Sequence, residues 1–232
     1  MTIGIIGAME PEVNDLIEAL DGHEIIKTRI ADIHKGSIKG KDVAIVQCGI
    51  GKCSAAAVTA VLIDRCSPSA VINTGCAGAI AADLHIGDVI FSTKAAHHDA
   101  DLTVFGYAKG QMAGHELFFN ADPAMMAKSD IAAANIPELK NKYKSGLVVS
   151  GDQFINTPER RDESRKMFPD AAVCEMEGAA IAQICYDCET PFLIIRAVSD
   201  AACEGESITY DEFMPKAAAL SAKFVTALLP LL

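Results

Sequence analysis

The chain has 232 residues, and its 31 acidic side chains outnumber its 20 Lys and Arg side chains, so the formal net charge is −11. A strongly acidic surface repels phosphate backbones, so nucleic acid is not an expected partner and a neutral or cationic small molecule is favoured. No apolar run approaches the ~20 residues that a membrane span needs, so no membrane association is expected.

Strand-like and helix-like segments alternate along the chain, which is typical of an α/β protein. The first apolar run lacks the basic start of a secretory leader and is predicted to be a core strand. Predicted strands cover residues 2–7, 24–30, 33–38, 42–48, 69–74, 86–95, 145–150, 171–174 and 192–198. Predicted helices cover residues 10–20, 52–66, 122–135, 158–168, 177–187 and 211–229. A polar and aromatic stretch over 97–121 has no clear periodicity and is predicted to be a binding loop.

Several of these strands are apolar on both faces and are separated by helices. The pattern predicts a central mixed β-sheet flanked by helices, a three-layer α/β architecture in a single domain over residues 1–232. Ligands of such sheets gather at the carboxyl ends of the strands. Polar or aromatic side chains of interest follow five predicted strand ends, at Glu12, Cys76, Phe154, Glu177 and Asp200.

The eight cysteines are expected to be reduced thiols. A chain of this length needs no disulfide staples, and Cys48 and Cys174 stand in apolar, strand-like runs. Cys185 and Cys188 form a lone CxxC pair without a second pair or a nearby His, so the end of a helix is favoured over a zinc site. Reduced thiols indicate a cytoplasmic protein.

Three motifs resemble cofactor or metal sites, but each is incomplete: Gly4-Ile-Ile-Gly7, Gly49-Ile-Gly51-Lys52 and His97-His98-Asp99-Ala-Asp101. The first lacks the rest of a dinucleotide fingerprint, and the second has Val46 where a P-loop needs its first Gly. In the third, adjacent histidines in a strand would point to opposite faces, which makes chelation awkward. We therefore expect neither a cofactor nor a metal.

Acidic side chains mark two other strand ends. Glu175 and Glu177 flank Met176 where a strand meets a helix, and their alternative role is charge compensation at the helix N-terminus. Asp200 follows a very apolar strand, where poor solvation should raise its pKa and suit it to act as a general acid. The alternative for Asp200 is pairing with Arg196 or capping the next turn.

Seven segments, taken in order, resemble the nucleoside phosphorylase and nucleosidase superfamily and, within it, the 5′-methylthioadenosine/S-adenosylhomocysteine nucleosidases. These segments cover residues 3–12, 49–52, 73–78, 98–107, 149–155, 175–178 and 196–200. The resemblance runs from residue 2 to about residue 229, and seven motifs in order make it specific. It implies a homodimer, because in this family the other subunit completes the pocket for the 5′ substituent.

The resemblance implies that the small-molecule partner is an adenine nucleoside. Asp200 is the implied acid that protonates adenine N7, and Glu12 is the implied base that takes a proton from water, with Arg196 orienting that site. Glu177 is implied to hold the ribose hydroxyls, and Met176 to pack under the sugar. The implied binding set is Met9, Ile50, Cys76, Phe105, Tyr107, Phe154, Ile155, Glu175, Met176, Glu177, Arg196, Ser199 and Tyr210.

Within that set, Phe154 is implied to stack on adenine, and the backbone of Ile155 to read the edge of the base. The wall around the ribose and the 5′-alkylthio group is implied to be Met9, Ile50, Phe105, Tyr107 and Tyr210. Two positions depart from the family pattern. Cys76 stands where these nucleosidases carry Ser, and a thiol is the weaker hydrogen-bond donor. Ala113 stands where a Pro of the neighbouring subunit often caps the 5′ pocket.

The implied chemistry requires two carboxyl groups in opposite protonation states. Adenine is a poor leaving group as an anion and must be protonated as it departs. Water attacks the oxocarbenium-like sugar from the other face, by analogy with inverting glycosidases. An exposed Asp has a pKa of about 3.9, so the apolar strand before Asp200 is what would raise it. Arg196 would help to keep Glu12 ionised.

The main alternative is a phosphate-dependent purine nucleoside phosphorylase, which needs a cationic phosphate site. In purine phosphorylases one Arg stands near the position of Asn73 and another follows the first strand, where this chain has Glu12. An anionic Glu12 repels phosphate and suits water activation, which favours hydrolysis. Two further alternatives are a nucleosidase acting on 6-amino-6-deoxyfutalosine and a nucleoside-binding sensor without catalysis.

Overall fold

The computed structural model describes residues 1–200 and 210–232, with side chains described for 1–200 and 213–232. The strands are β1 Ile3–Gly7, β2 Asp21–Lys27, β3 Asp32–Ile38, β4 Lys41–Gln47, β5 Ala70–Ala79, β6 Val89–His97, β7 Phe119–Asn120, β8 Tyr143–Ser150, β9 Ala171–Glu175 and β10 Phe192–Asp200. The helices are α1 Glu10–Glu18, α2 Lys52–Cys66, α3 Pro123–Ala134, α4 Pro158–Met167, α5 Gly178–Asp187 and α6 Tyr210–Leu228. Short 3₁₀ turns cover Thr103–Phe105, Pro137–Leu139 and Leu229–Leu231.

The strands form one mixed sheet, in the order β10-β6-β8-β9-β5-β1-β4-β3-β2, with the short β7 paired to β6. Strand β10 also pairs with β5, in parallel, so five strands close on themselves and the others extend the sheet away from this closed part. β1 is parallel to both β4 and β5, whereas β9 runs antiparallel to β5. The predicted mixed sheet flanked by helices is confirmed.

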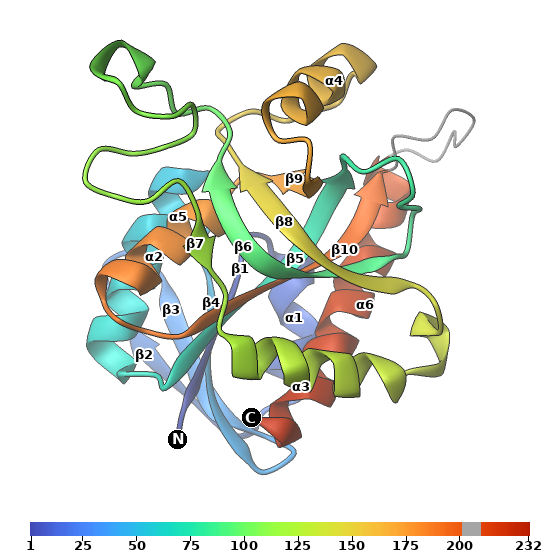
Figure 1. Cartoon of the computed structure of the whole chain (residues 1–232). Helices are drawn as coiled ribbons and strands as arrows, with labels where there is room; N and C mark the ends of the chain where they lie inside the picture. The colour runs from blue at the N-terminus through green and yellow to red at the C-terminus, as the bar shows by residue number, and fades with distance from the viewer. Residues whose placement is uncertain (201–209) are drawn as a thin grey trace.

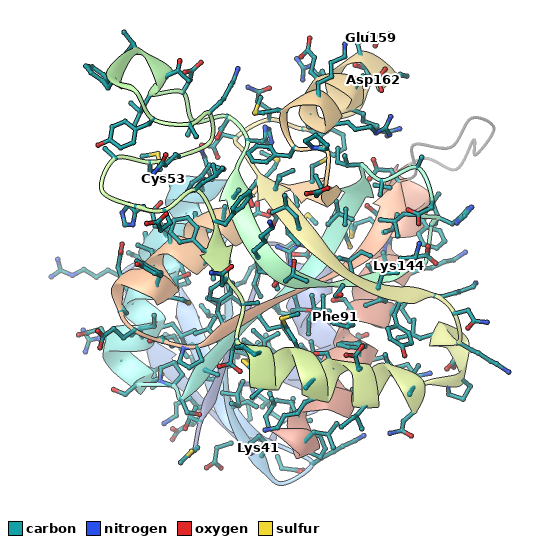
Figure 2. The ribbon with its side chains drawn as sticks, in the orientation of Figure 1. Lys41, Cys53, Phe91, Lys144, Glu159 and Asp162 are labelled. Atoms are coloured by element: carbon teal, nitrogen blue, oxygen red, sulfur yellow. The ribbon has the colours of Figure 1, made fainter. Side chains whose placement is uncertain are left out.

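Five of the helices pack against one another in two groups. α2 packs against α5, while α1 and α3 both contact α6 (Figure 1). The strands at the centre are buried along their whole length because they carry almost only apolar or small residues, as in the run Ile-Gly-Ile-Ile-Gly of β1. Phe91 of β6 is fully buried between these layers (Figure 2) and packs on the ring of Phe224 from α6. This core holds the strand ends in fixed positions.

The strands β5 and β10 continue past their predicted ends, and both carry site residues. β5 continues to Ala79 and β10 to Asp200, because the two strands pair along this extra length, with Gly75 opposite Arg196 and Cys76 opposite Ala197. Gly75, Cys76 and Gly78 come after the predicted strand over 69–74 and instead form part of β5. The helix predicted over 211–229 is α6, Tyr210–Leu228, and Thr209 just before it lies outside the described residues.

The stretch over 97–121 is a long loop that rises from the end of β6, with one 3₁₀ turn and the short strand β7. It projects from the upper left of the molecule, and α4 stands at the top beyond the ends of β8 and β9 (Figure 1). Glu159 and Asp162 lie on α4 at the outer edge of the molecule (Figure 2). Across 1–200 and 210–232, no helix has the length and apolarity to cross a membrane.

Candidate active site

A cavity of about 330 Å³ opens where six strands end. Most of the predicted site residues line it: Met9, Glu12, Ile50, Cys76, Phe154, Ile155, Glu175, Met176, Glu177, Ser199 and Asp200. The structure adds five lining residues that the sequence did not single out for this site: Ala8, Ala77, Gly78, Gln153 and Cys174. Each of the five is within two residues of a predicted site residue. Their closeness to the predicted strand ends was therefore the signal that could have identified them.

Four of the predicted site residues are not among the described residues that line the cavity. Phe105 lies on the Thr103–Phe105 turn with 75% of its surface exposed, and Tyr107 follows it on the same loop. Arg196 lies fully buried behind the cavity wall. The side chain of Tyr210 lies outside the described residues. In this single chain, the loop that carries Phe105 and Tyr107 does not close over the cavity.

Glu12 is held by three backbone N–H groups. It occupies the third position of α1, and its Oε2 accepts hydrogen bonds from the N–H of Ala8 at 2.8 Å and of Met9 at 3.0 Å. Its Oε1 accepts from the N–H of Cys76 at 3.0 Å. A Cβ on Gly75 would lie 2.5 Å from Oε1, so only glycine leaves room for this carboxylate. Hydrogen bonds of this kind are strong and fix the position of the carboxylate.

Cys76 presents a neutral thiol to the same part of the cavity. Its Sγ donates to the carbonyl of Met214 at 3.6 Å. Burial, followed by the charge of Glu12, raises the pKa of Cys76 far above its usual range. A thiol in this state is a poor nucleophile, so Cys76 serves as a weak donor and a packing group.

Arg196 and Glu175 form a fully buried ion pair under the cavity. The guanidinium Nη2 lies 2.5 Å from Glu175 Oε2 and 2.5 Å from Asn73 Oδ1. The resemblance implied that Arg196 orients the site of Glu12, but its bonds go to Glu175 and Asn73 instead. Burial opposes the charge of Arg196, yet Glu175, Glu12 and Glu177 together raise its pKa. Arg196 therefore acts on Glu12 through space rather than through a bond.

Glu175 and Glu177 have different environments, although both line the cavity. Glu175 accepts hydrogen bonds from the N–H of Gly178 at the start of α5 and from the Ser150 hydroxyl, which is the helix N-terminal role considered as its alternative. Glu177 accepts from the N–H of Gly51 at 2.8 Å. Burial, and then the charge of Glu175, raise the pKa of Glu177 to about 7. Glu177 is therefore the carboxyl group of this pair that remains available to a ligand.

Asp200 is bonded through both carboxylate oxygens. Its Oδ1 accepts from the Ser199 hydroxyl at 3.0 Å, and its Oδ2 lies 3.1 Å from Nη2 of Arg161. A Cβ on Gly78 would lie 2.9 Å from Oδ2, so this glycine makes room for the carboxylate. Arg196 was the alternative partner predicted for Asp200, but the partner in the structure is Arg161 of α4. Nothing local in the sequence points to that pairing.

The segment after β8 forms part of the cavity lining. Phe154 is 48% exposed at the mouth, whereas Ile155 is buried below it. The carbonyl of Phe154 accepts a hydrogen bond from Nη1 of Arg160 at 3.2 Å, so α4 braces this segment. An exposed aromatic ring above an apolar floor suits a flat heteroaromatic ligand.

Comparison with known proteins identifies the family of this chain. The family model described as Phosphorylase superfamily matches residues 2–230. This match places the chain in the phosphorylase superfamily. A 5′-methylthioadenosine/S-adenosylhomocysteine nucleosidase of Shewanella sediminis is 45% identical over 231 residues, which cover 99% of each chain.

Solved structures point the same way. One is the 5′-methylthioadenosine/S-adenosylhomocysteine nucleosidase from Neisseria meningitidis, solved in complex with methylthio-immucillin-A. It is 41% identical in sequence and superposes with a TM-score of 0.94, and the match covers 100% of this chain and 99% of that chain. Within the superfamily, this chain therefore belongs to the family of 5′-methylthioadenosine/S-adenosylhomocysteine nucleosidases, which are N-glycosyl hydrolases. A futalosine hydrolase of Helicobacter pylori is also similar, at 30% identity and a TM-score of 0.91, with 100% of this chain and 98% of that one covered.

Proposed function

We propose that this chain hydrolyses the N-glycosidic bond of 5′-methylthioadenosine and S-adenosylhomocysteine and releases adenine, with Asp200 as general acid and Glu12 as base for water. The observation that carries the proposal is the placing of two carboxylates along β5. Glu12 lies over Gly75 and Cys76, and Asp200 lies over Gly78. The backbone positions that they contact are two to three residues apart on β5, and both carboxylates line the same cavity. Inverting glycosidases likewise act with two carboxyl groups that flank the bond to be cleaved and leave room for water.

In the proposed reaction, Asp200 delivers a proton to N7 as the bond to adenine breaks. The base leaves as neutral adenine, and the sugar develops oxocarbenium character. Glu12 accepts a proton from the attacking water, so the hydroxyl adds to the anomeric carbon as the proton leaves. Glu177 accepts hydrogen bonds from the ribose hydroxyls, which requires its carboxylate form. The raised pKa of Glu177, about 7, therefore makes ribose binding sensitive to pH near neutrality.

The charges around the cavity favour water over phosphate as the nucleophile. Among the described residues that line the cavity there is no Lys or Arg, whereas Glu12, Glu175, Glu177 and Asp200 all line it. Arg196 is already engaged by Glu175 and Asn73. A phosphate dianion would meet repulsion here rather than a cationic site. This supports the hydrolase over the phosphorylase.

The single chain leaves the 5′ end of the proposed site open. Val104 and Phe105 stand exposed on the loop after β6, and Met112 is also exposed further along it. Neighbouring exposed apolar side chains commonly mark a contact surface. We propose a cytoplasmic homodimer in which this loop meets the second copy, and that this contact brings Phe105 and Tyr107 to the 5′ substituent.

The proposed function is tested by measuring adenine release from a panel of adenine nucleosides with and without phosphate. Release from methylthioadenosine in phosphate-free buffer is the expected result. Release only after phosphate is added would establish the phosphorylase. The panel includes 6-amino-6-deoxyfutalosine because of the similarity to the Helicobacter pylori futalosine hydrolase. Tight nucleoside binding without turnover would establish a sensor.

Replacing Cys76 by Ser is expected to be tolerated. The thiol is neutral and already donates a hydrogen bond, so a hydroxyl of similar size can take its place. We expect kcat/KM for methylthioadenosine to stay within about fivefold, which corresponds to about 1 kcal/mol, the net value of one hydrogen bond. A loss of a hundredfold or more in the same steady-state assay would show that the thiol has a chemical role of its own.

A further inference from the structure

A set of charged contacts outside the cavity ties together three loops that are remote in sequence. Lys52 begins α2, Asp99 follows β6 and Asp152 follows β8. Lys52 Nζ lies 2.5 Å from Asp99 Oδ1, and the N–H of Asp152 donates to Asp99 Oδ2 at 2.8 Å. The N–H of Lys52 donates to Asp152 Oδ1 at 2.8 Å, which closes the ring of contacts. We call this set the Lys52–Asp99–Asp152 clasp.

The clasp differs from the ion pairs on the surface of the protein. The side chains of Lys52 and Asp99 are 21% and 14% exposed, whereas those of the Lys27–Asp32 pair on the β2–β3 hairpin are 72% and 41% exposed. Burial alone would raise the pKa of Asp99, but the hydrogen bonds from Lys52 and Asp152 hold it below its usual range. Exposed pairs contribute little, because water and salt screen them. A shielded pair that also binds backbone N–H groups restrains the loops that carry it.

The backbone around the clasp leaves little room for movement. Gly51 has a φ of 95°, and a Cβ there would lie 3.1 Å from Asp152 Oδ1. A Cβ on Gly151 would lie 2.5 Å from the imidazole of His98. Both glycines therefore allow the three loops to approach more closely than other residues would permit.

Two of the three loops, those with Lys52 and Asp152, lead into the cavity. Each carries cavity residues within two positions of Lys52 or Asp152. Ile50 and Gly51 precede Lys52, and Gly51 donates its N–H to Glu177 at 2.8 Å. Gln153 and Phe154 follow Asp152 and line the cavity. We propose that the Lys52–Asp99–Asp152 clasp is a positioning device for the nucleoside site, which holds the Gly51 N–H on Glu177 and the Phe154 segment over the base. The roles of Glu177 and Phe154 rest on the proposed function.

The contact from Gly51 has an electrostatic consequence for Glu177. Four groups face this carboxyl: Glu175 from β9, Arg196 from β10, Glu12 from α1, and the Cys48 thiol after β4. Burial and Glu175 raise the pKa of Glu177, while the Gly51 N–H and Arg196 lower it. If the clasp opens and Gly51 withdraws, one of the opposing contacts is lost and the pKa of Glu177 rises further. Glu177 then becomes protonated at a higher pH than in the unaltered protein.

The test compares Asp99→Asn and Lys52→Met with Asp32→Asn, a matched change in a Lys–Asp pair of the same 2.5 Å length that lies on the hairpin. We expect Asp99→Asn and Lys52→Met each to lower kcat/KM for methylthioadenosine by about tenfold, mainly through KM, because the site is misplaced rather than removed. The acidic limb of the kcat/KM profile should move to higher pH. Lys52→Arg, which keeps the cation, should restore most of the loss, and Asp32→Asn should change neither quantity.

Binding measurements separate this proposal from the proposed function. Because Glu177 faces the ribose, Asp99→Asn should weaken binding of methylthioadenosine more than binding of free adenine in calorimetry. The clasp proposal is overturned if Asp99→Asn lowers only the melting temperature and leaves KM, the acidic limb and the two affinities unchanged. If the unaltered protein neither binds nor cleaves methylthioadenosine, it is the proposed function that fails.

Discussion

Replacing Asp200 by Asn is expected to lower kcat for methylthioadenosine by about 10²–10⁴-fold, the usual contribution of a general acid. Asn has the shape of Asp: its oxygen can keep the hydrogen bond from Arg161 and its N–H₂ group can donate to the Ser199 hydroxyl, but it has no acidic proton to give to N7. Because that proton is needed mainly in the transition state, KM should change far less than kcat. Steady-state kinetics together with calorimetric binding of the substrate will measure both quantities.

The matched control for this variant is Asp162→Asn. Asp162 lies on the outer part of α4 and pairs only with the neighbouring Arg165 among the contacts described for it (Figure 2). Its replacement should leave kcat and KM unchanged. Equal losses of kcat and binding affinity in Asp200→Asn would refute the acid role and would indicate that Asp200 only binds the base.

Replacing Glu12 by Gln is expected to have a similarly large effect, a fall in kcat of about 10²–10⁴-fold. The amide cannot take a proton from water. Its N–H₂ group would also face one of the N–H donors that Glu12 now binds, from Ala8, Met9 or Cys76. We expect adenine release to fall to this degree in phosphate-free buffer, and added phosphate should not restore it.

Glu10→Gln provides the control for the Glu12 variant. Glu10 is exposed in the same first turn of α1 and does not line the cavity. It should retain full activity, and its melting temperature reports the general effect of removing one acidic charge from this turn. Glu12→Gln with normal kcat in the absence of phosphate would overturn the proposed role of Glu12 as the base.

The local patterns of the sequence were enough for most of the secondary structure. The predicted helix over 52–66 matches α2, Lys52–Cys66, because a turn of glycines precedes it and an unbroken Ala-rich run forms it. The apolar runs that became β1 and β10 were equally clear, since residues buried on both faces need no polar alternation. The far ends of β5 and β10 were not predictable, because small residues such as Gly75 and Gly78 extend a strand only when a partner strand lies alongside.

The sequence by itself determined which chemical groups are available: acids that follow apolar strands, an aromatic ring in a loop, and thiols in a core. It also placed most of them at one edge of a mixed sheet, since strand ends in such folds converge. Only the tertiary structure decided which charges meet. Asp200 pairs with Arg161, 39 residues away, and Arg196 bonds to Asn73, 123 residues away. Local patterns of polarity carry no information about such contacts, because the distance between two side chains far apart in the chain is set by how the whole sheet packs. For Asp200 and Arg196, which the sequence singled out, the partners were therefore found only in the folded molecule.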